Sequence, residues 1–398
     1  MLRRKMIQKA YRYRLYPDEK QKIYFAKSFG CVRFIWNRML DDKKEYYRKT
    51  GKLLYVTPAM YKKEYPFLRE VDSLALANVQ LDLKGAYTSW LDGRTNQPKH
   101  KVKKKCRDSY TTNNQGGTIM VEGNRIKLPK IKWVKAKIHR AIPNDAVIKS
   151  ATVSRTKSGN YYCSVLFELD EEMRNPIPAV EESKILGLDY SSGHFYVDNN
   201  GHRADAPHWL RDAEKKLVRE QKKLSRMLRK NTRGYDGHKR PIYIRPLYEC
   251  KNIQKQIHRV AVIHEKVSNA RKNWCHQESR KITNSCDAVI LEDIDLRNMG
   301  RSLHLGKATN DNGFGMFRTF LTYKMKEQGK YVIKVSKTFP SSQLCSCCGS
   351  KNPEVKNLKI RKWECPSCHA VHDRDENAAL NLKQEGMRIL SQNVMILQ

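Results

Sequence analysis

The chain has 398 residues, and its 78 Lys and Arg against 41 Asp and Glu give a formal net charge of +37 at pH 7. A surplus of this size indicates a polyanionic partner, of which nucleic acid is the commonest. Apolar residues make up 39% of the chain, enough for buried cores and too many for wholesale disorder. The sequence offers no apolar run long enough to span a bilayer and no signal-peptide core. We therefore expect no membrane contact, and the eleven cysteines favour a reducing cytoplasm over a disulfide scaffold.

The first part of the chain predicts a β domain interrupted by helices. Residues 11–15 alternate apolar and basic side chains, which indicates a half-buried strand. Apolar side chains then recur at steps of three and four in residues 25–39 and 76–90, so each segment predicts an amphipathic helix, the second beginning near Asp72. Between residues 118 and 169 the period changes to two, which predicts a small antiparallel barrel or sandwich. If the first strand joins this sheet, the helices form an insertion within a β domain.

The second part of the chain predicts a mixed α/β domain. The acidic and proline-bearing segment 170–183 marks the boundary before it. Residues 185–188, 288–291 and 331–335 have the composition of buried strands, and 195–197 is expected to pair with the first of them. Two long amphipathic helices with densely basic outer faces are predicted between the first and second of these strands.

A cysteine cluster predicts a structural zinc site. Two C-x2-C pairs, sixteen residues apart, have the spacing of a zinc ribbon, because each pair grips one face of a tetrahedral ion. Four thiolates would leave no open coordination position, so this zinc is expected to hold a fold together. The four expected ligands are Cys345, Cys348, Cys365 and Cys368. Cys347 is surplus, and His369 or His372 could replace one ligand.

Three acidic residues follow or precede regular elements of the α/β part. Asp189 and Glu292 each end a predicted strand, and Asp375 lies at the start of a predicted helix after the cysteine cluster. A single carboxylate in such a position is usually solvated or a helix cap. Three on converging elements predict a site for Mg²⁺ or Mn²⁺, which prefer oxygen ligands. Two such ions, about 4 Å apart, suit phosphodiester hydrolysis.

Several motifs resemble the TnpB family, transposon-encoded RNA-guided DNA endonucleases related to the ancestors of type V CRISPR effectors. The segments that carry the resemblance are Phe339–Cys345, Asn352–Leu358, Trp363–Pro366 and His372–Ala379 near the C-terminus, with Lys9–Pro17 and Arg33–Asn37 near the N-terminus. The C-terminal motifs are the more specific, and the resemblance runs nearly from end to end.

The resemblance implies an α+β multidomain fold. It implies a β-barrel wedge domain with an inserted helical recognition lobe, followed by an RNase H-like α/β RuvC nuclease domain with an inserted zinc ribbon. The implied boundaries are 1–16 for the first wedge strand, 17–114 for the helical recognition lobe, 115–182 for the rest of the wedge and a linker, 183–338 for the RuvC domain, 339–371 for the ribbon, which would bind target nucleic acid, and 372–398 for the last RuvC motif and C-terminal tail.

The resemblance also assigns roles to the acidic residues. By position, Asp189, Glu292 and Asp375 match the three RuvC acids, which are catalytic and would hold Mg²⁺ or Mn²⁺. The neighbouring Asp293, Asp295 and Asp373 are expected to be supporting or solvated. The segment 190–193 departs from the commoner family pattern, in which a glycine closely follows the first acid.

The implied partners are a guide RNA and a target double-stranded DNA. The resemblance implies a monomer bound to one RNA, in the cytoplasm of a prokaryote and at the nucleoid when it acts. Candidate phosphate contacts are Lys222, Lys223, Arg226, Arg229 and Lys230, for which a solvated helix face is an equal alternative. Candidates for reading a short target-adjacent motif are Asn78, Thr112, Asn113 and Asn114.

The leading hypothesis is therefore an RNA-guided, Mg²⁺-dependent DNA endonuclease encoded by a transposon, which cuts guide-complementary DNA next to a short target-adjacent motif by a two-metal RuvC mechanism. One alternative is a nuclease-inactive RNA-guided DNA-binding repressor of the same fold, which loss of an acid would favour. Another is a compact CRISPR effector nuclease, which differs in genomic neighbourhood. A plain zinc-ribbon RNA-binding or ribosomal protein would explain the charge and the cysteines but not the three acids.

Overall fold

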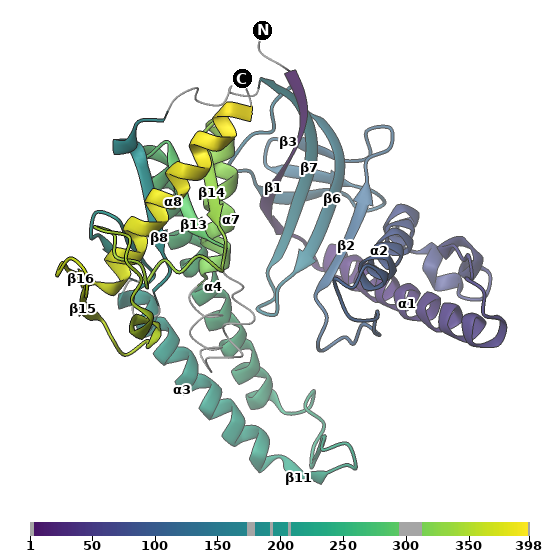
Figure 1. The fold of residues 1–398 in the computed structure, drawn as a ribbon. Coiled ribbons are helices and arrows are strands. Elements are labelled where there is room, and N and C mark those ends of the chain that lie inside the picture. Colours follow the sequence, from purple (N-terminus) through teal and green to yellow (C-terminus); the bar gives the residue numbers. More distant parts are fainter. Residues whose placement is uncertain (1–3, 173–179, 192–193, 206–207, 294–312, 397–398) are drawn as a thin grey trace. The chain divides into compact units, whose positions relative to one another are not determined.

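The computed structural model describes residues 4–172, 180–191, 194–205, 208–293 and 313–396 (Figure 1). The chain forms two compact units, one of Arg3–Glu172 and the other of Met173–Gln398 with the first two residues. Among the described helices, none combines the length and the apolar character that crossing a bilayer requires.

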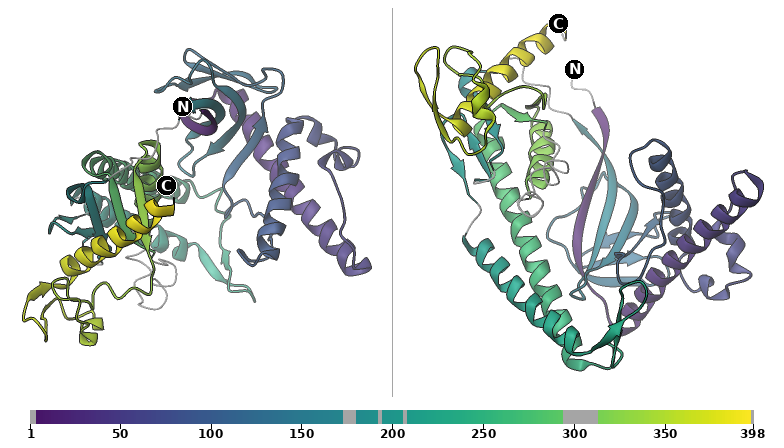
Figure 2. Two further views of the ribbon diagram at one scale, coloured as in Figure 1. Left: turned by 45° about the horizontal axis from the view of Figure 1, so that its top comes forward. Right: turned by 60° about the horizontal axis from the view of Figure 1, so that its bottom comes forward.

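The unit Arg3–Glu172 is built on one curled antiparallel sheet of seven strands (Figure 2). The strands are β1 Arg4–Tyr16, β2 Asp108–Asn113, β3 Met120–Glu122, β4 Arg125–Leu128, β5 Lys132–Lys137, β6 Val147–Arg155 and β7 Tyr161–Glu172. Their order is β2-β6-β7-β1-β5-β4-β3. The N-terminal strand β1 pairs with β7 and β5, so the expectation that it joins the later sheet is confirmed, and the helices between are an insertion.

Both helices predicted for this unit form, and the second begins where the sequence predicts. Helix α1 Glu19–Thr50 starts at Asp18, whose carboxylate accepts the backbone N–H of Gln21 in a capping box. Helix α2 Ser73–Leu91 starts at Asp72, whose carboxylate accepts the backbone N–H groups of Leu74 and Ala75. Their facing apolar stripes form one core, while Trp90 of the predicted second stripe is 36% exposed. The short 3₁₀ helices η1 Pro58–Lys62 and η2 Pro66–Arg69 connect them.

Strand β2 was not predicted. In β2 the buried side chains are Asp108, Tyr110 and Thr112, so a strand with period-two burial carries a mostly polar sequence. Hydrophobic periodicity therefore gives no strand signal in these residues. Because β2 pairs with β6, residues 108–113 belong to the sheet and the helical insertion ends before the expected limit of residue 114.

The second unit contains a five-stranded mixed sheet of order β10-β9-β8-β13-β14. Its strands are β8 Ile185–Asp189, β9 Tyr196–Asp198, β10 Arg203–Ala204, β13 Ala288–Glu292 and β14 Tyr331–Val335. Strands β8, β13 and β14 are mutually parallel, whereas β9 is antiparallel to β8 and β10 to β9. The four strands predicted here are thus confirmed, including the pairing of 195–197 with 185–188, which is that of β9 with β8.

Helices cover both faces of this sheet. The described helices of this unit are α3 His208–Lys230, α4 Lys251–Ser285, α7 Phe314–Glu327 and α8 Arg374–Ile396, and the last three cover the sheet. Helix α8 packs on one face through Leu382, against Ile185 and Ile290 of the strands. Helices α4 and α7 pack on the other face, against Val289 and Leu291 (Figure 1). Strand β13 is therefore buried on both faces, which explains its continuous apolar run.

Helices α3 and α4, both predicted from the sequence, pack side by side as an antiparallel pair (Figure 2). A small hairpin that joins them, β11 Thr232–Tyr235 with β12 Pro241–Tyr243, was not predicted, and neither was α7. The cysteine cluster lies around the hairpin β15 Lys362–Glu364 and β16 Val371–Asp373, and the remaining 3₁₀ turns are η3 Glu182–Lys184 and η4 Pro353–Lys356.

Gly187 allows α8 to lie directly on β8. A Cβ atom at Gly187 would stand 2.3 Å from the backbone oxygen of Ala379 and 2.9 Å from the backbone nitrogen of Lys383, both in α8. We expect Gly187→Ala to lower the free energy of unfolding by about 1–3 kcal/mol, because the helix must move away from the strand. Urea unfolding followed by circular dichroism measures this. Gly234→Ala, where the added Cβ meets nothing within 4 Å, is the control, and an equal loss there would contradict the packing argument.

Candidate functional site

The first two predicted acids lie at one edge of the mixed sheet. Strands β8 and β13 are parallel with Leu188 opposite Leu291, so Asp189 and Glu292 are the next residues in the same register. Side chains of a strand alternate between faces. Since Ile185 and Ile290 pack against α8, the acids, an even number of positions further on, face the same side. Sequence and register together therefore place both carboxylates on the α8 face.

The third acid comes to this edge from α8. Asp375 lies in the first turn of that helix. Burial first, and then the negative charges of Asp375 and Glu292, raise the pKa of Asp189 well above its usual value. Burial also raises the pKa of Glu292. The three acids, far apart in the chain, thus lie close enough for their negative charges to repel one another. A bound cation would reduce this repulsion.

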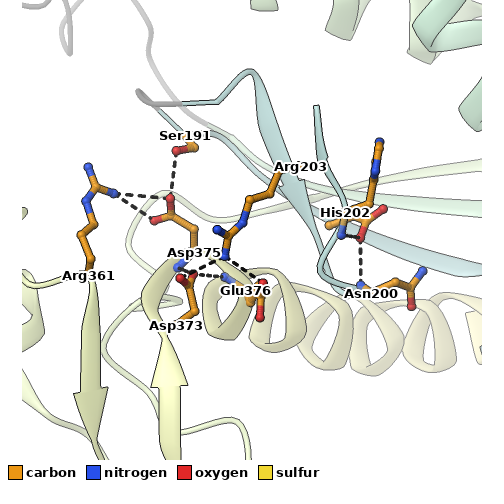
Figure 3. A network of polar contacts seen from close by, with 9 residues as sticks. Ser191, Asn200, His202, Arg203, Arg361, Asp373, Asp375 and Glu376 are labelled. Carbon is orange, nitrogen blue, oxygen red and sulfur yellow. Dashed lines mark hydrogen bonds and ion pairs between the residues drawn. The ribbon is translucent and has the colours of Figure 1, made fainter. Parts of the chain in front are cut away.

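Two further side chains contact Asp375 (Figure 3). Ser191, which follows β8, donates its hydroxyl to one carboxylate oxygen of Asp375 at 2.9 Å. A guanidinium nitrogen of Arg361, just before β15, lies 3.4 Å from both oxygens of Asp375. Ser191 falls in the segment where the sequence departs from the commoner family pattern, and here it links the first acid's loop to the third acid.

The spacing of the acids is wider than that of a single-ion cage. In the described parts of the chain, sets of three or more candidate ligands with all ligand atoms within 4.8 Å occur among the cysteines and His372, and not among Asp189, Glu292 and Asp375.

The acids expected to play supporting parts differ from one another. Asp373 accepts the backbone N–H groups of Asp375 and Glu376 at 3.1 and 3.3 Å, so it caps α8. Asp293 is exposed and lies 3.9 Å from Arg318. Asp295 lies outside the described residues.

The four predicted zinc cysteines come together. Their sulfur atoms all lie within 4.8 Å of one another, with Cys345 to Cys368 and Cys348 to Cys365 both at 3.6 Å. Tetrahedral zinc with Zn–S bonds of about 2.3 Å requires sulfur atoms about 3.8 Å apart, so the residues fit the ion. All four are free thiols, and the backbone N–H of Cys368 is the main group that lowers the pKa of Cys365, to about 6, which favours the thiolate that zinc binds.

The surplus groups form a second, overlapping set. Cys345, Cys347 and His372 also have ligand atoms within 4.8 Å of one another, and Nε2 of His372 lies 3.1 Å from the sulfur of Cys345. His372 is therefore placed to contact a zinc-bound thiolate, whereas His369 is turned to Glu364 at 2.9 Å.

Buried amides tie the ribbon to α8. Asn377 accepts the backbone N–H of Ser346 at 2.9 Å and donates to the carbonyl of Leu344 at 2.6 Å. Asn381, one turn on, donates to the carbonyls of Ser341 and Leu344, both at 2.7 Å. Both asparagines are at most 3% exposed. The cysteine loop that begins at Cys345 is thus fixed to the helix that carries Asp375.

The candidate phosphate contacts lie on one exposed helix face. All five basic residues, Lys222, Lys223, Arg226, Arg229 and Lys230, are exposed on α3. The opposite face of α3 packs on α4 through Leu217, Val260 and Ile263. This face is available to a polyanion.

The candidate base contacts occupy different environments. Thr112 is fully buried and donates its hydroxyl to Asp72 at the start of α2, so its side chain is engaged within the protein. Asn114 donates to the carbonyl of Ile148 and accepts from a loop backbone N–H. Asn78 and Asn113 are half-buried, and their amides meet at 3.4 Å.

Three side chains around Asp375 were not among the predicted site residues. They are Ser191, Arg361 and Arg203, the last of which contacts both acids that flank Asp375. None has a local signal, because each acts on a partner far away in the chain; Ser191 and Asp375 are 184 positions apart.

Three family profiles match successive parts of the chain. A helix-turn-helix domain of IS605 OrfB matches residues 6–52, a probable transposase of the same OrfB type matches 168–303, and the Cas12f1-like TNB domain matches 314–382. In this structure residues 6–52 hold a strand and one 32-residue helix, so the first name does not describe their fold.

Two relatives align over nearly the whole chain, and a third aligns over a shorter part of it. A protein of Streptomyces pristinaespiralis, named as a candidate RNA-guided DNA endonuclease, is 28% identical over 96% of this chain and 90% of its own. InsQ of Escherichia coli (strain K12), named in the same way, is 24% identical over 97% and 94%. A TnpB-like protein of Acanthamoeba polyphaga mimivirus is 25% identical over 37% of this chain and 29% of its own.

A solved structure shares the fold. The Cas12f1 chain in a complex with guide RNA and target DNA aligns over 95% of this chain and 99% of its own, with a TM-score of 0.58 and 13% identity. The α+β multidomain fold with a curled sheet and a ribbon-like TNB domain is therefore that of Cas12f1. With the transposase profiles and the full-length relatives, these matches support a TnpB family protein.

Proposed function

We propose that this chain is an RNA-guided, Mg²⁺-dependent DNA endonuclease of a transposon, which cuts guide-complementary DNA beside a short target-adjacent motif. The observation that carries the proposal is the convergence of Asp189, Glu292 and Asp375 on one sheet edge, where burial and the charges of Asp375 and Glu292 raise the pKa of Asp189. The full-length relatives named for this activity support it.

The second unit is proposed to be an RNase H-like RuvC domain. Its strand order and directions support this, since three parallel strands are extended by an antiparallel pair at one edge. The segment 339–371 would be the inserted zinc ribbon, before the last RuvC motif and C-terminal tail from 372 to 398. In the first unit, we propose that the curled sheet is the wedge and that the helices inserted after β1 form the recognition lobe.

The chemistry proposed for the site is hydrolysis of a phosphodiester. Divalent ions, when bound, would supply an activated water and stabilise the departing oxygen. Asp189, Glu292 and Asp375 would hold the ions as carboxylates. Arg361 would move from Asp375 towards the DNA phosphate when a divalent ion takes those oxygens, because a guanidinium and a metal ion compete for the same charge.

The proposed partners explain the charge. A guide RNA and its heteroduplex with target DNA are dense in phosphate, and base pairing supplies the sequence specificity. The exposed basic face of α3, from Lys222 to Lys230, is the proposed contact to a phosphate backbone. Asn78, Asn113 and Asn114 are the proposed reading residues that remain partly exposed, whereas the buried Thr112 would hold α2 in place.

The test uses the protein purified with its co-purifying RNA, which is sequenced to define the guide. A DNA library with the guide match and a randomised flank is then incubated with the complex and Mg²⁺. We expect cuts in matched DNA next to one flanking motif, and none with a scrambled match or with EDTA. Binding of matched DNA without any cut would contradict the proposed nuclease activity and favour a DNA-binding repressor. A protein that purifies without RNA would contradict the proposal that a guide RNA directs it.

A further inference from the structure

The first turn of α8 and the residue that caps it carry three carboxylates within four residues, and these are engaged differently (Figure 3). Asp375 faces Ser191 and Arg361. The acids on either side of it face Arg203 instead. One guanidinium nitrogen of Arg203 lies 3.0 Å from Asp373 and 2.8 Å from Glu376. Arg203 therefore bridges the two acids that flank Asp375 without touching Asp375 itself.

Arg203 is held at the level of the first acid in the sheet. Val197 of β9 pairs with Asp189 on one side and with Arg203 on the other. Arg203 is thus two strands, or about 10 Å, across the sheet from Asp189. The turn before it is fixed by the buried Asp198, which accepts the backbone N–H groups of Asn200 and His202, both at 2.9 Å.

These contacts give Arg203 two effects on Asp375. It fixes the start of α8 to the sheet whose strand β8 ends in Asp189, and its single positive charge offsets one of the two negative charges of Asp373 and Glu376. Without it, the flanking acids would repel the acids of the site and would be free to compete for a metal ion. With it, Asp375 is the carboxylate of the three that is left for the ion.

We propose that Arg203 is a positioning residue for metal binding, which holds Asp375 against Asp189 by clamping Asp373 and Glu376. The inference rests on the proposed function of the acids. Its stability contribution is small, because Arg203 and Glu376 are each about 40% exposed and such ion pairs stabilise little. Its effect on the site is large, because residues that orient metal ligands change metal affinity by about 10–100-fold.

The test compares three variants of the RNA complex. Arg203→Gln removes both ion pairs, and Arg203→Lys keeps the positive charge but replaces the planar guanidinium with an ammonium group. Arg388→Gln is the matched control, since Arg388 also pairs with a glutamate of α8, Glu385 at 2.6 Å, away from the acids. DNA cleavage is measured as a function of Mg²⁺ concentration. Separately, Fe²⁺ with ascorbate and peroxide replaces Mg²⁺, and radical cuts in the protein backbone beside the acids report bound ion without DNA cleavage.

For Arg203→Gln we expect half-maximal cleavage to need about tenfold more Mg²⁺, with iron-directed cuts weakened to match. Its unfolding temperature should stay within about 2 °C of the wild type. Arg203→Lys should be intermediate and Arg388→Gln unchanged. An Arg203→Gln complex with wild-type metal dependence overturns the inference. A wild type that shows iron-directed cuts but never cuts DNA contradicts the proposed function alone, and the iron cuts still decide the role of Arg203.

Discussion

Asp189→Asn is expected to reduce guide-directed DNA cleavage by at least about 10³-fold while leaving RNA binding unchanged. The amide keeps the size of the carboxylate and loses the charge that would hold a divalent ion. Asp189 ends β8 in the same register as Glu292, so the substitution removes the central one of the three converging charges. Single-turnover cleavage of matched DNA at saturating Mg²⁺ measures the loss, and a filter-binding assay measures RNA affinity.

The same substitution should not destabilise the protein. Burial and the neighbouring acids raise the pKa of Asp189 in the folded chain. A carboxyl whose folded pKa is raised opposes folding at pH values above its unfolded pKa, so at neutral pH the ionised group costs stability. Removing its charge relieves this cost, and in metal-free buffer we expect an unfolding temperature equal to or above that of the wild type. A fall in cleavage would then reflect the site and not the fold.

Asp293→Asn is the matched control. Asp293 directly follows Glu292 but is exposed, near Arg318 and Lys334 at 3.9 and 3.8 Å. Cleavage by this variant should remain within about twofold of the wild type, because exposed ion pairs contribute little. Wild-type cleavage by Asp189→Asn, or an equal loss in both variants, would show that the acids are wrongly assigned.

Cys365→Ser is expected to remove zinc and to unfold the ribbon. Cys365 is fully buried among the sulfur atoms of the cluster. Structural zinc sites contribute apparent binding free energies of roughly 10–16 kcal/mol, and a ribbon of this size has little other core. Metal analysis of the purified protein should fall from about one zinc per chain to near zero. Limited proteolysis should then cut within 339–371.

Loss of zinc should also abolish DNA cleavage. Asn377 and Asn381 fasten the first cysteine loop to α8, so an unfolded ribbon releases the helix start that presents Asp375. Cys347→Ser is the control, because Cys347 is exposed and lies outside the four-cysteine set, and it should keep both zinc and cleavage. Zinc lost from Cys347→Ser but kept by Cys365→Ser would instead favour the set of Cys345, Cys347 and His372.

Much of the architecture could be predicted because its signals are local. Asp18 and Asp72 each indicate the start of a helix, because a helix cap involves only the next three residues. The alternating burial of β7 and the unbroken apolar run of β13 distinguish a one-sided strand from one covered on both faces. Strand ends in turn located Asp189 and Glu292, and cysteine spacing located the four thiols that the structure brings together.

The rest required the tertiary structure, because it depends on partners far apart in the chain. Nothing near residue 112 shows that a threonine in a polar strand is buried against Asp72. Nothing near residue 203 shows that an arginine on a two-residue strand reaches Asp373 and Glu376. Among Asp373, Asp375 and Glu376, which acid is left for a metal depends on how α8 docks on the sheet. Composition and periodicity thus determined the elements and their chemistry, whereas strand register and helix docking decided which side chains meet, since those interactions form between segments that the sequence does not connect.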